Sequence, residues 1–153
     1  MAPIRVMVNG IPGNMAARVA SHAIKDDRFQ LIPQSLTGPE ISETEYRLGP
    51  VELTLLHPET RDAEIAETIT RQGPFICVDY THPSAVNENA EFYCRHGLPF
   101  VMGTTGGDRF RLEKTVCDAA IAAVIAPNMA KQINWKLGKT SITTAKPRRI
   151  LSP

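Results

Sequence analysis

Short apolar runs alternate along this chain with longer segments in which aliphatic side chains recur at helical spacing. The apolar runs predict strands over residues 4–8, 31–35, 51–56, 75–79, 100–102 and 123–125. A regular succession of strands and helices is typical of a mainly parallel sheet with helices on both faces. The pattern therefore predicts an α/β fold, a doubly wound sheet within one domain.

Each predicted helix carries a stripe of side chains on one face. The stripes are Met15, Val19 and Ala23; Ile65 and Ile69; Val86, Ala90 and Tyr93; and Phe110, Val116 and Ala120. Pro83 stands where a first helical turn accepts a proline. Residues 37–50 break the pattern, because their Gly, Pro, Ser, Thr and Glu content predicts a surface excursion. We expect it to lead into a strand with antiparallel pairing.

Length and composition narrow the class of protein. A chain of 153 residues with 42% hydrophobic and 22% charged residues is typical of one globular domain. Its formal net charge of +1 gives no field that would attract a nucleic acid or a membrane, so we expect neither as a partner. Cys77, Cys94 and Cys117 fit neither a disulfide framework nor a metal knuckle, so we expect reduced, buried thiols and no metal site.

The sequence VMVNGIPGNMA, residues 6–16, runs from the first predicted strand through a glycine turn into a helix. Gly10 can turn the chain sharply, and Gly13 lets the backbone approach an anion closely. Ala16 is small enough to permit close packing of the helix on the strand. This layout holds a phosphate in dinucleotide-binding proteins, but two glycines so spaced also occur in plain turns. On this motif alone, both interpretations stay open.

Three further segments come directly after predicted strands. They are Asp79-Tyr80-Thr81-His82-Pro83, Gly103-Thr104-Thr105-Gly106-Gly107 and Ala126-Pro127-Asn128-Met129. Ligands of an open parallel sheet bind at the carboxyl ends of its strands, so we expect these segments to meet at the edge that carries Gly10. Their small and polar residues let backbone amides and hydroxyls reach a flat polar ligand.

Together these segments resemble the N-terminal domain of dihydrodipicolinate reductase, also called 4-hydroxy-tetrahydrodipicolinate reductase, of the lysine and diaminopimelate pathway. The resemblance rests on VMVNG..G.MA, VDYTHPSAVNENAEFYC, HGLPFVMGTTGGDR and VIAPNMAKQ and covers most of residues 5–132. It is closest to the plant and cyanobacterial branch. The resemblance implies a Rossmann-like oxidoreductase domain over residues 1–132 that binds NADPH, with NADH as the alternative. It places the protein in the cytoplasm, or in the chloroplast stroma if a transit peptide has been removed.

The resemblance also implies where the cofactor lies. The turn at Gly10 would hold the pyrophosphate, residues 103–105 would lie along the nicotinamide half, and residues 126–128 would close over the nicotinamide ring. Ser35 and Thr37 stand where the family meets the adenine ribose, and because neither is acidic they favour NADPH over NADH. The implied cofactor-binding residues are Gly10, Ile11, Pro12, Gly13, Asn14, Met15, Ser35, Thr37, Tyr80, Thr81, Gly103, Thr104, Thr105, Ala126, Pro127 and Asn128.

Beyond Gln132 the sequence departs from the family. Family members continue into a substrate domain with a histidine-rich stretch, a lysine and a glycine-threonine segment, whereas residues 133–153 read as a divergent basic tail. None of His22, His57, His82 and His96 matches the family's catalytic histidine. We therefore expect a truncated domain with no catalytic residue, inactive on its own toward the family substrate.

Two other interpretations accompany this one. The first is a regulatory or interaction protein that uses the truncated fold to bind a protein partner, and the second is a small active reductase with a pocket assembled between subunits. Ala16, where the family usually has glycine, favours the first of these over the second. An uncovered strand edge predicts a homodimer or a complex with another protein, with Ile133, Trp135 and Leu137 at the interface.

Overall fold

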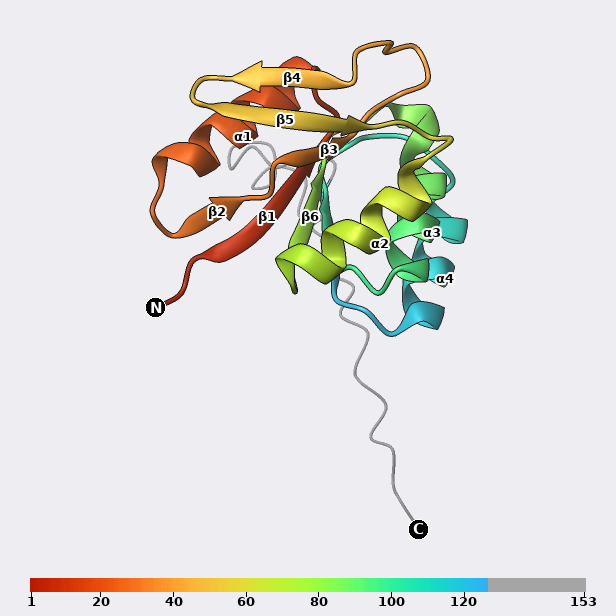
Figure 1. The fold of residues 1–153 in the computed structure, drawn as a ribbon. Coiled ribbons are helices and arrows are strands. Elements are labelled where there is room, and N and C mark those ends of the chain that lie inside the picture. Colours follow the sequence, from red (N-terminus) through yellow and green to blue (C-terminus); the bar gives the residue numbers. More distant parts are fainter. Residues whose placement is uncertain (127–153) are drawn as a thin grey trace, which may run out of the picture.

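Five parallel strands form the central sheet of residues 1–126, the part of the chain that the computed structural model describes (Figure 1). Their order is β2-β1-β6-β7-β8. The bounds are β1 (Ile4–Asn9), β2 (Phe29–Leu31), β6 (Ile76–Asp79), β7 (Phe100–Met102) and β8 (Ala123–Ile125). The predicted α/β, Rossmann-like fold is confirmed, and the strands predicted over 4–8, 75–79, 100–102 and 123–125 are found to within a residue. The predicted tail 133–153 lies outside the described residues.

The segment predicted as one strand over 31–35 is divided between two sheets, so that prediction is wrong. β2 ends at Leu31, and β3 (Gln34–Leu36) opens a second sheet of order β3-β5-β4. Pro33 lies between them and has no N–H to donate to a strand ladder. Its carbonyl instead accepts a hydrogen bond from the Thr54 N–H in β5 (Val51–Leu56), at 2.9 Å.

Residues 37–50 contain a strand that the sequence pattern did not predict, β4 (Glu45–Leu48). β4 pairs antiparallel with β5, and β5 pairs parallel with β3 on its other side. The expected antiparallel pairing is therefore confirmed on one side of β5 only. Four residues that alternate polar and apolar are too short a pattern to separate a strand from a loop.

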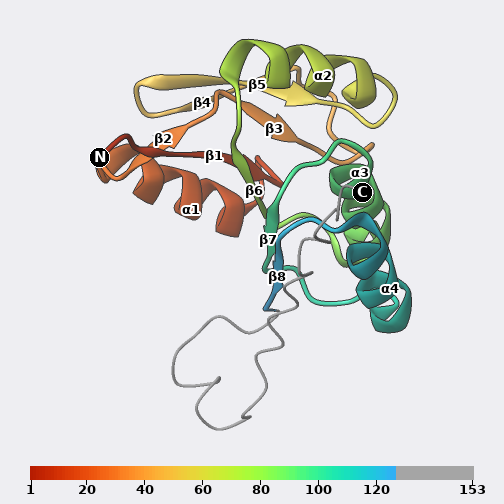
Figure 2. The same ribbon diagram turned by 90° about the horizontal axis from the view of Figure 1, so that it is seen from below.

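Helices cover both faces of the central sheet. They are α1 (Asn14–Lys25), α2 (Arg61–Gln72), α3 (Val86–Arg95, after a 3₁₀ turn Pro83–Ala85) and α4 (Arg109–Ala119). Figure 2 shows α1 on one side of the strands and α3 beside α4 on the other. Met7 of β1 packs in one core with Ile65 of α2 and Val116 of α4, and Val8 packs in another core with Ala20 of α1. No helix within residues 1–126 is long and apolar enough to cross a membrane.

Two of the predicted helix stripes differ from the buried faces. α1 buries Ala16, Ala20 and Ala23, while Met15 is 53% exposed, because the helix packs closely on the sheet through its alanines. Phe110 of α4 is 80% exposed, and Ala120 ends that helix in a left-handed conformation. The stripe Val86, Ala90 and Tyr93 of α3 is buried as predicted.

Candidate functional site

The carboxyl ends of the strands meet at one edge, joined by backbone hydrogen bonds. Gly10 N donates to Leu36 O (2.9 Å), Tyr80 N to Asn9 O (3.0 Å), Gly103 N to Asp79 O (2.9 Å) and Ala126 N to Met102 O (3.0 Å). The last three bonds continue the β1–β6, β6–β7 and β7–β8 pairings past the ends of their ladders, and the first joins the end of β1 to β3 of the second sheet. The structure thus brings together the segments that the sequence placed at this edge, which we call the carboxyl edge.

Gly10 and Gly13 shape the turn between β1 and α1. Gly10 has a φ of 108°, and a Cβ there would collide with the backbone carbonyl of Tyr80. Gly13 N donates to Gly10 O at 2.8 Å, and a Cβ at Gly13 would lie only 2.7 Å from that oxygen. Position 10 therefore requires glycine both for its positive φ and because there is no room for a Cβ, whereas position 13 requires it only because there is no room for a Cβ.

The amino end of α1 is open to an anion. Gly13, Asn14 and Met15 are exposed, and in the described residues this helix has neither a side-chain cap nor an acidic residue in its first turn. α2 differs, since Asp62 and Glu64 occupy its first turn. The unpaired N–H groups and the positive end of the helix dipole at α1 therefore suit a phosphate.

Tyr80 fills the space between the turn after β1 and the turn after β7. Its backbone lies against Gly10, and its ring lies so close to Gly103 that a Cβ there would collide with it. Burial raises the pKa of Tyr80, so its phenol stays protonated at neutral pH. Thr104 is 9% exposed, whereas Thr105 is exposed.

Asp79, at the end of β6, is the centre of a buried hydrogen-bond network. Its Oδ1 accepts from Thr81 N (3.0 Å), Thr81 Oγ1 (2.7 Å) and Thr104 Oγ1 (3.1 Å), and its Oδ2 accepts from Tyr93 Oη (2.6 Å) and Asn89 Nδ2 (3.1 Å). A buried carboxylate is costly unless it is hydrogen-bonded, and here both oxygens are satisfied. The network ties β6 to α3 and to the turn after β7.

Asn9 carries this network across the sheet to β3. Its Nδ2 donates to Tyr93 Oη at 2.9 Å, and its Oδ1 accepts from Leu36 N at 2.8 Å. Sequence reasoning missed Asn9, Asn89 and the second role of Tyr93, which it assigned to an apolar stripe. Two signals were available: a polar residue ends each of two buried strands, and a buried tyrosine hydroxyl usually needs a partner.

Ser35 and Thr37 use their hydroxyls inside the protein. Ser35 is fully buried and its Oγ accepts from Ile11 N at 3.3 Å, and Thr37 Oγ1 donates to Ile11 O at 3.0 Å. These two side chains therefore fix the glycine turn against the end of β3. A different side chain reaches the surface there, because the Glu40 carboxylate folds over Gly38.

The remaining predicted residues are placed as follows. Pro12 is half-buried beside Ile11 in the turn, Thr81 is half-buried after β6, and Ala126 is buried at the end of β8. Pro127 and Asn128 lie outside the described residues.

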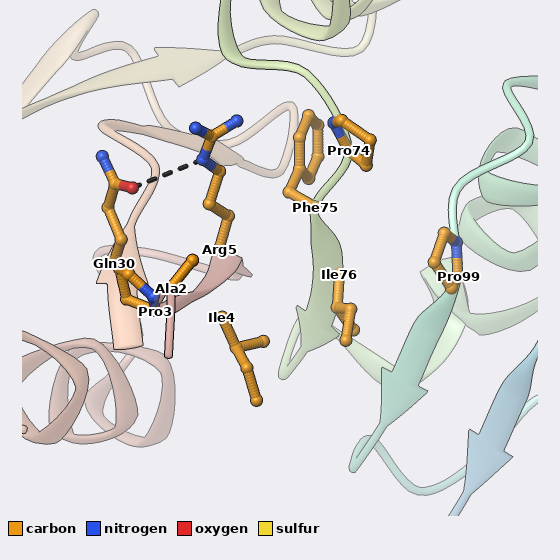
Figure 3. A pocket seen from close by; sticks show the side chains of 9 residues that line it. All are labelled: Ala2, Pro3, Ile4, Arg5, Gln30, Pro74, Phe75, Ile76 and Pro99. Atoms are coloured by element: carbon orange, nitrogen blue, oxygen red, sulfur yellow. Dashed lines mark hydrogen bonds between the residues drawn. The ribbon is translucent and has the colours of Figure 1, made fainter. Parts of the chain in front are cut away.

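A hollow of about 410 Å³ lies at the opposite edge of the sheet, where the strands begin (Figure 3). It is lined by Ala2, Pro3, Ile4, Arg5, Gln30, Pro74, Phe75, Ile76 and Pro99. Arg5 Nε donates to Gln30 Oε1 at 3.3 Å, so the guanidinium and the amide on its wall pair with each other. None of the predicted site residues lies here.

The thiols and histidines of the described residues form no metal site. No group of three His, Cys, Asp or Glu side chains within residues 1–126 could hold a metal ion. Cys77 is buried as expected, Cys94 is half-buried and Cys117 is exposed, so the expectation of buried thiols is wrong for Cys117. Burial and the neighbouring Glu91 raise the pKa of Cys94 to about 11, which keeps this thiol protonated.

A glycine turn that opens a helix at the carboxyl edge of a parallel sheet is typical of nucleotide-binding α/β domains. The family model described as dihydrodipicolinate reductase, N-terminus, matches residues 4–129, and the chain belongs to this family. The resemblance found in the sequence is thereby confirmed.

Plant proteins are among the most similar curated relatives. The chain is 40% identical over 128 residues to the probable 4-hydroxy-tetrahydrodipicolinate reductase 2, chloroplastic, of Oryza sativa subsp. japonica, with 84% of this chain and 39% of the relative covered. It is 42% identical over 130 residues to the 4-hydroxy-tetrahydrodipicolinate reductase 2, chloroplastic, of Arabidopsis thaliana, with 85% and 37% covered. The chain thus spans about two fifths of the length of these relatives.

A solved structure agrees on the fold. The dipicolinate-bound dihydrodipicolinate reductase from Paenisporosarcina sp. TG-14 aligns with a TM-score of 0.62 at 19% identity, covering 82% of this chain and 48% of that one. The chain is therefore the N-terminal nucleotide-binding domain of this reductase family, and the family supports a nicotinamide dinucleotide as the class of cofactor. These comparisons give no support to a regulatory or interaction protein.

Proposed function

We propose that this chain binds a nicotinamide dinucleotide along the carboxyl edge. The pyrophosphate lies at the turn from Gly10 to Gly13, and the nicotinamide half lies toward Thr104. The observation that carries the proposal is the open start of α1 beside a turn that only glycine can form. Titration with NADPH, followed by nicotinamide fluorescence, tests it: saturable binding is expected, and no binding at millimolar NADPH would contradict it.

Within the family's reaction we assign this chain the cofactor-binding part. The relatives are named reductases, and a reductase of this kind transfers a hydride from the dihydronicotinamide ring to its substrate. Here the chain orients the ring, and we assign no catalytic residue within residues 1–126. The word chloroplastic in the names of the plant relatives supports the chloroplast stroma as the compartment, with the cytoplasm as the alternative.

We propose NADPH as the preferred cofactor. An acidic side chain at the end of the strand that follows α1 binds the ribose hydroxyls of NADH and repels the 2′-phosphate of NADPH. In this chain the strand after α1 is divided, and Ser35 and Thr37 lie at the end of β3, which meets the glycine turn through the bond from Gly10 N to Leu36 O. Neither residue is acidic, and their hydroxyls are used to hold Ile11. Neither residue therefore places a negative charge against the 2′-phosphate of NADPH.

The position of the Glu40 carboxylate favours NADH instead. Its carboxylate lies over Gly38, just beyond the end of β3, on the side where the adenine ribose would bind. Replacing the carboxylate by an amide, Glu40→Gln, removes a negative charge and changes little else. We expect the variant to bind NADPH about threefold more tightly relative to NADH, because one exposed charge is worth well under 1.4 kcal/mol. An unchanged ratio would show that Glu40 does not act on the cofactor choice.

We also propose that the chain forms a homodimer or a stable complex with another protein. Within the described residues β8 is an edge strand of the central sheet, and pairing with a second chain would cover the backbone groups that this edge presents. The predicted contacts of Ile133, Trp135 and Leu137 lie outside the described residues. Light scattering of the pure chain at micromolar concentration gives the mass, and a strict monomer would contradict the homodimer.

A further inference from the structure

We propose that Asp79 and Tyr93 are positioning residues that hold Thr104 and the turn at Thr81 in place for the nicotinamide half of the cofactor. The proposal rests on the proposed function, since it concerns the same edge of the sheet. It assigns a role to two fully buried residues that do not themselves reach the cofactor.

The geometry gives Thr104 one defined hydrogen-bonding role. Its Oγ1 lies 3.1 Å from Asp79 Oδ1, 3.3 Å from Asp79 O and 3.4 Å from Thr81 O, all of them acceptors. A threonine hydroxyl has one proton and two lone pairs. Because the proton is directed inward to these oxygens, the lone pairs are left for a donor that approaches from the edge. By accepting the Thr104 proton, Asp79 thus leaves the Thr104 hydroxyl as a hydrogen-bond acceptor toward the edge where the cofactor would lie.

Thr81 is oriented from the same carboxylate. Its N–H and its hydroxyl both donate to Asp79 Oδ1, at 3.0 and 2.7 Å, and its hydroxyl accepts from Asn89 Nδ2 at 2.9 Å. The Asn89 amide is held in turn by Arg61, whose Nη1 donates to Asn89 Oδ1 at 2.8 Å. The turn after β6 therefore has its orientation fixed by hydrogen bonds to the buried interior.

Tyr93 fixes the other oxygen of Asp79. Its hydroxyl donates to Asp79 Oδ2 at 2.6 Å and accepts from Asn9 Nδ2 at 2.9 Å, so it cannot turn without breaking both bonds. Burial, and after it the charge of Asp79, raise the pKa of Tyr93 well above its ordinary value, so it stays a donor at every pH near neutral. The carboxylate is thereby locked with Oδ1 toward Thr81 and Thr104.

The other half of the edge meets this network through Asn9, whose Nδ2 donates to Tyr93 Oη and whose Oδ1 accepts from Leu36 N. Ser35 and Thr37 fix Ile11, and Gly13 N bonds Gly10 O, without any contact to Asp79. Removing the Tyr93 hydroxyl leaves the bond from Leu36 N to Asn9 Oδ1 in place, so it should disturb the nicotinamide half and leave the adenosine and pyrophosphate half intact. This asymmetry separates a positioning role from a general contribution to stability.

The test compares two ligands on the full 153-residue chain. The affinity for NADPH depends on both halves of the edge. The affinity for 2′-phospho-ADP-ribose, which lacks the nicotinamide, depends only on the adenosine and pyrophosphate half. Tyr93→Phe removes one hydroxyl, and Asp79→Asn is the second variant in case the first is silent. The matched control is Thr68→Val in α2, which removes a buried hydroxyl that donates to Glu64 O at 2.8 Å, remote from the edge. Melting temperatures show which variants fold.

We expect Tyr93→Phe to bind NADPH about tenfold more weakly, an effect of about 1.4 kcal/mol or one hydrogen bond, with unchanged affinity for 2′-phospho-ADP-ribose. Thr68→Val should bind both ligands as the wild type does. Two results would overturn the inference while leaving the proposed function standing. One is an equal loss of affinity for both ligands, and the other is unchanged NADPH affinity in both the Tyr93 and the Asp79 variants. A wild-type chain that binds neither ligand would overturn the proposed function itself.

Discussion

The two edges of the central sheet differ in almost every physical respect. At the carboxyl edge, glycines bring the turns into contact and buried polar side chains join four strand ends. At the amino edge, proline and apolar side chains line a hollow of about 410 Å³ whose two polar groups pair with each other. A hollow offers volume, but a dinucleotide needs ordered donors and acceptors. The polar organisation, and not the empty space, is therefore the reason that we propose the carboxyl edge as the cofactor site.

The largest effect should come from closing the glycine turn. Gly13→Val places a branched side chain where a Cβ alone would lie 2.7 Å from Gly10 O. We expect NADPH affinity to fall by about 100-fold, equivalent to about 2.8 kcal/mol, because the pyrophosphate loses its approach to the backbone. Fluorescence titration measures the affinity, and circular dichroism checks that the variant folds. A well-folded Gly13→Val chain that binds NADPH normally would remove the turn from the site.

A smaller effect should appear at high pH. The folded pKa of Tyr93 is raised well above the unfolded value of 10.0, by burial first and by the charge of Asp79 second. The stability contributed by the protonated phenol is therefore complete below pH 10 and is lost as the pH rises above it. Between roughly pH 9.5 and 11, the melting temperature of the wild type should fall more steeply than that of Tyr93→Phe. Parallel curves for the two proteins would mean that this phenol ionises as easily in the folded chain as in the unfolded one.

The smallest effect should come from the amino edge. Arg5→Gln and Gln30→Ala remove the polar pair on the wall of the hollow, far along the strands from the carboxyl edge. We expect both variants to bind NADPH within about twofold of the wild type, since additivity between distant sites holds to a few tenths of a kcal/mol. A loss beyond tenfold in either variant would make the hollow part of the binding site.

Much of this fold could be predicted from the sequence because apolar runs and turn residues act locally. The glycine turn, the strands before Tyr80 and Gly103, and the buried stripe of α3 follow from spacing alone. The division of the strand at Pro33 could not be predicted, since it depends on Thr54 as a distant partner. The exposure of Met15 also depends on tertiary packing, because both faces of α1 carry small or aliphatic residues.

For the site, the sequence predicted which segments converge but not what holds them. Ser35 and Thr37 have the residue types of a ligand contact, yet their hydroxyls bond to Ile11. Asp79 and Tyr93 are 14 positions apart in the chain, and nothing local indicates that their side chains meet at 2.6 Å. Hydrogen bonds between distant elements are the part of a site that periodicity does not reveal.

The most direct test is to map NADPH binding on the backbone amides of the ¹⁵N-labelled chain by NMR. We expect the largest shift changes at Gly10, Gly13 and Thr104, on the carboxyl edge, with the amides of Arg5, Gln30 and Ile76 on the amino edge unchanged. Saturating changes confined to the amino edge, or no changes at millimolar NADPH, would contradict the assignment of the cofactor to the carboxyl edge.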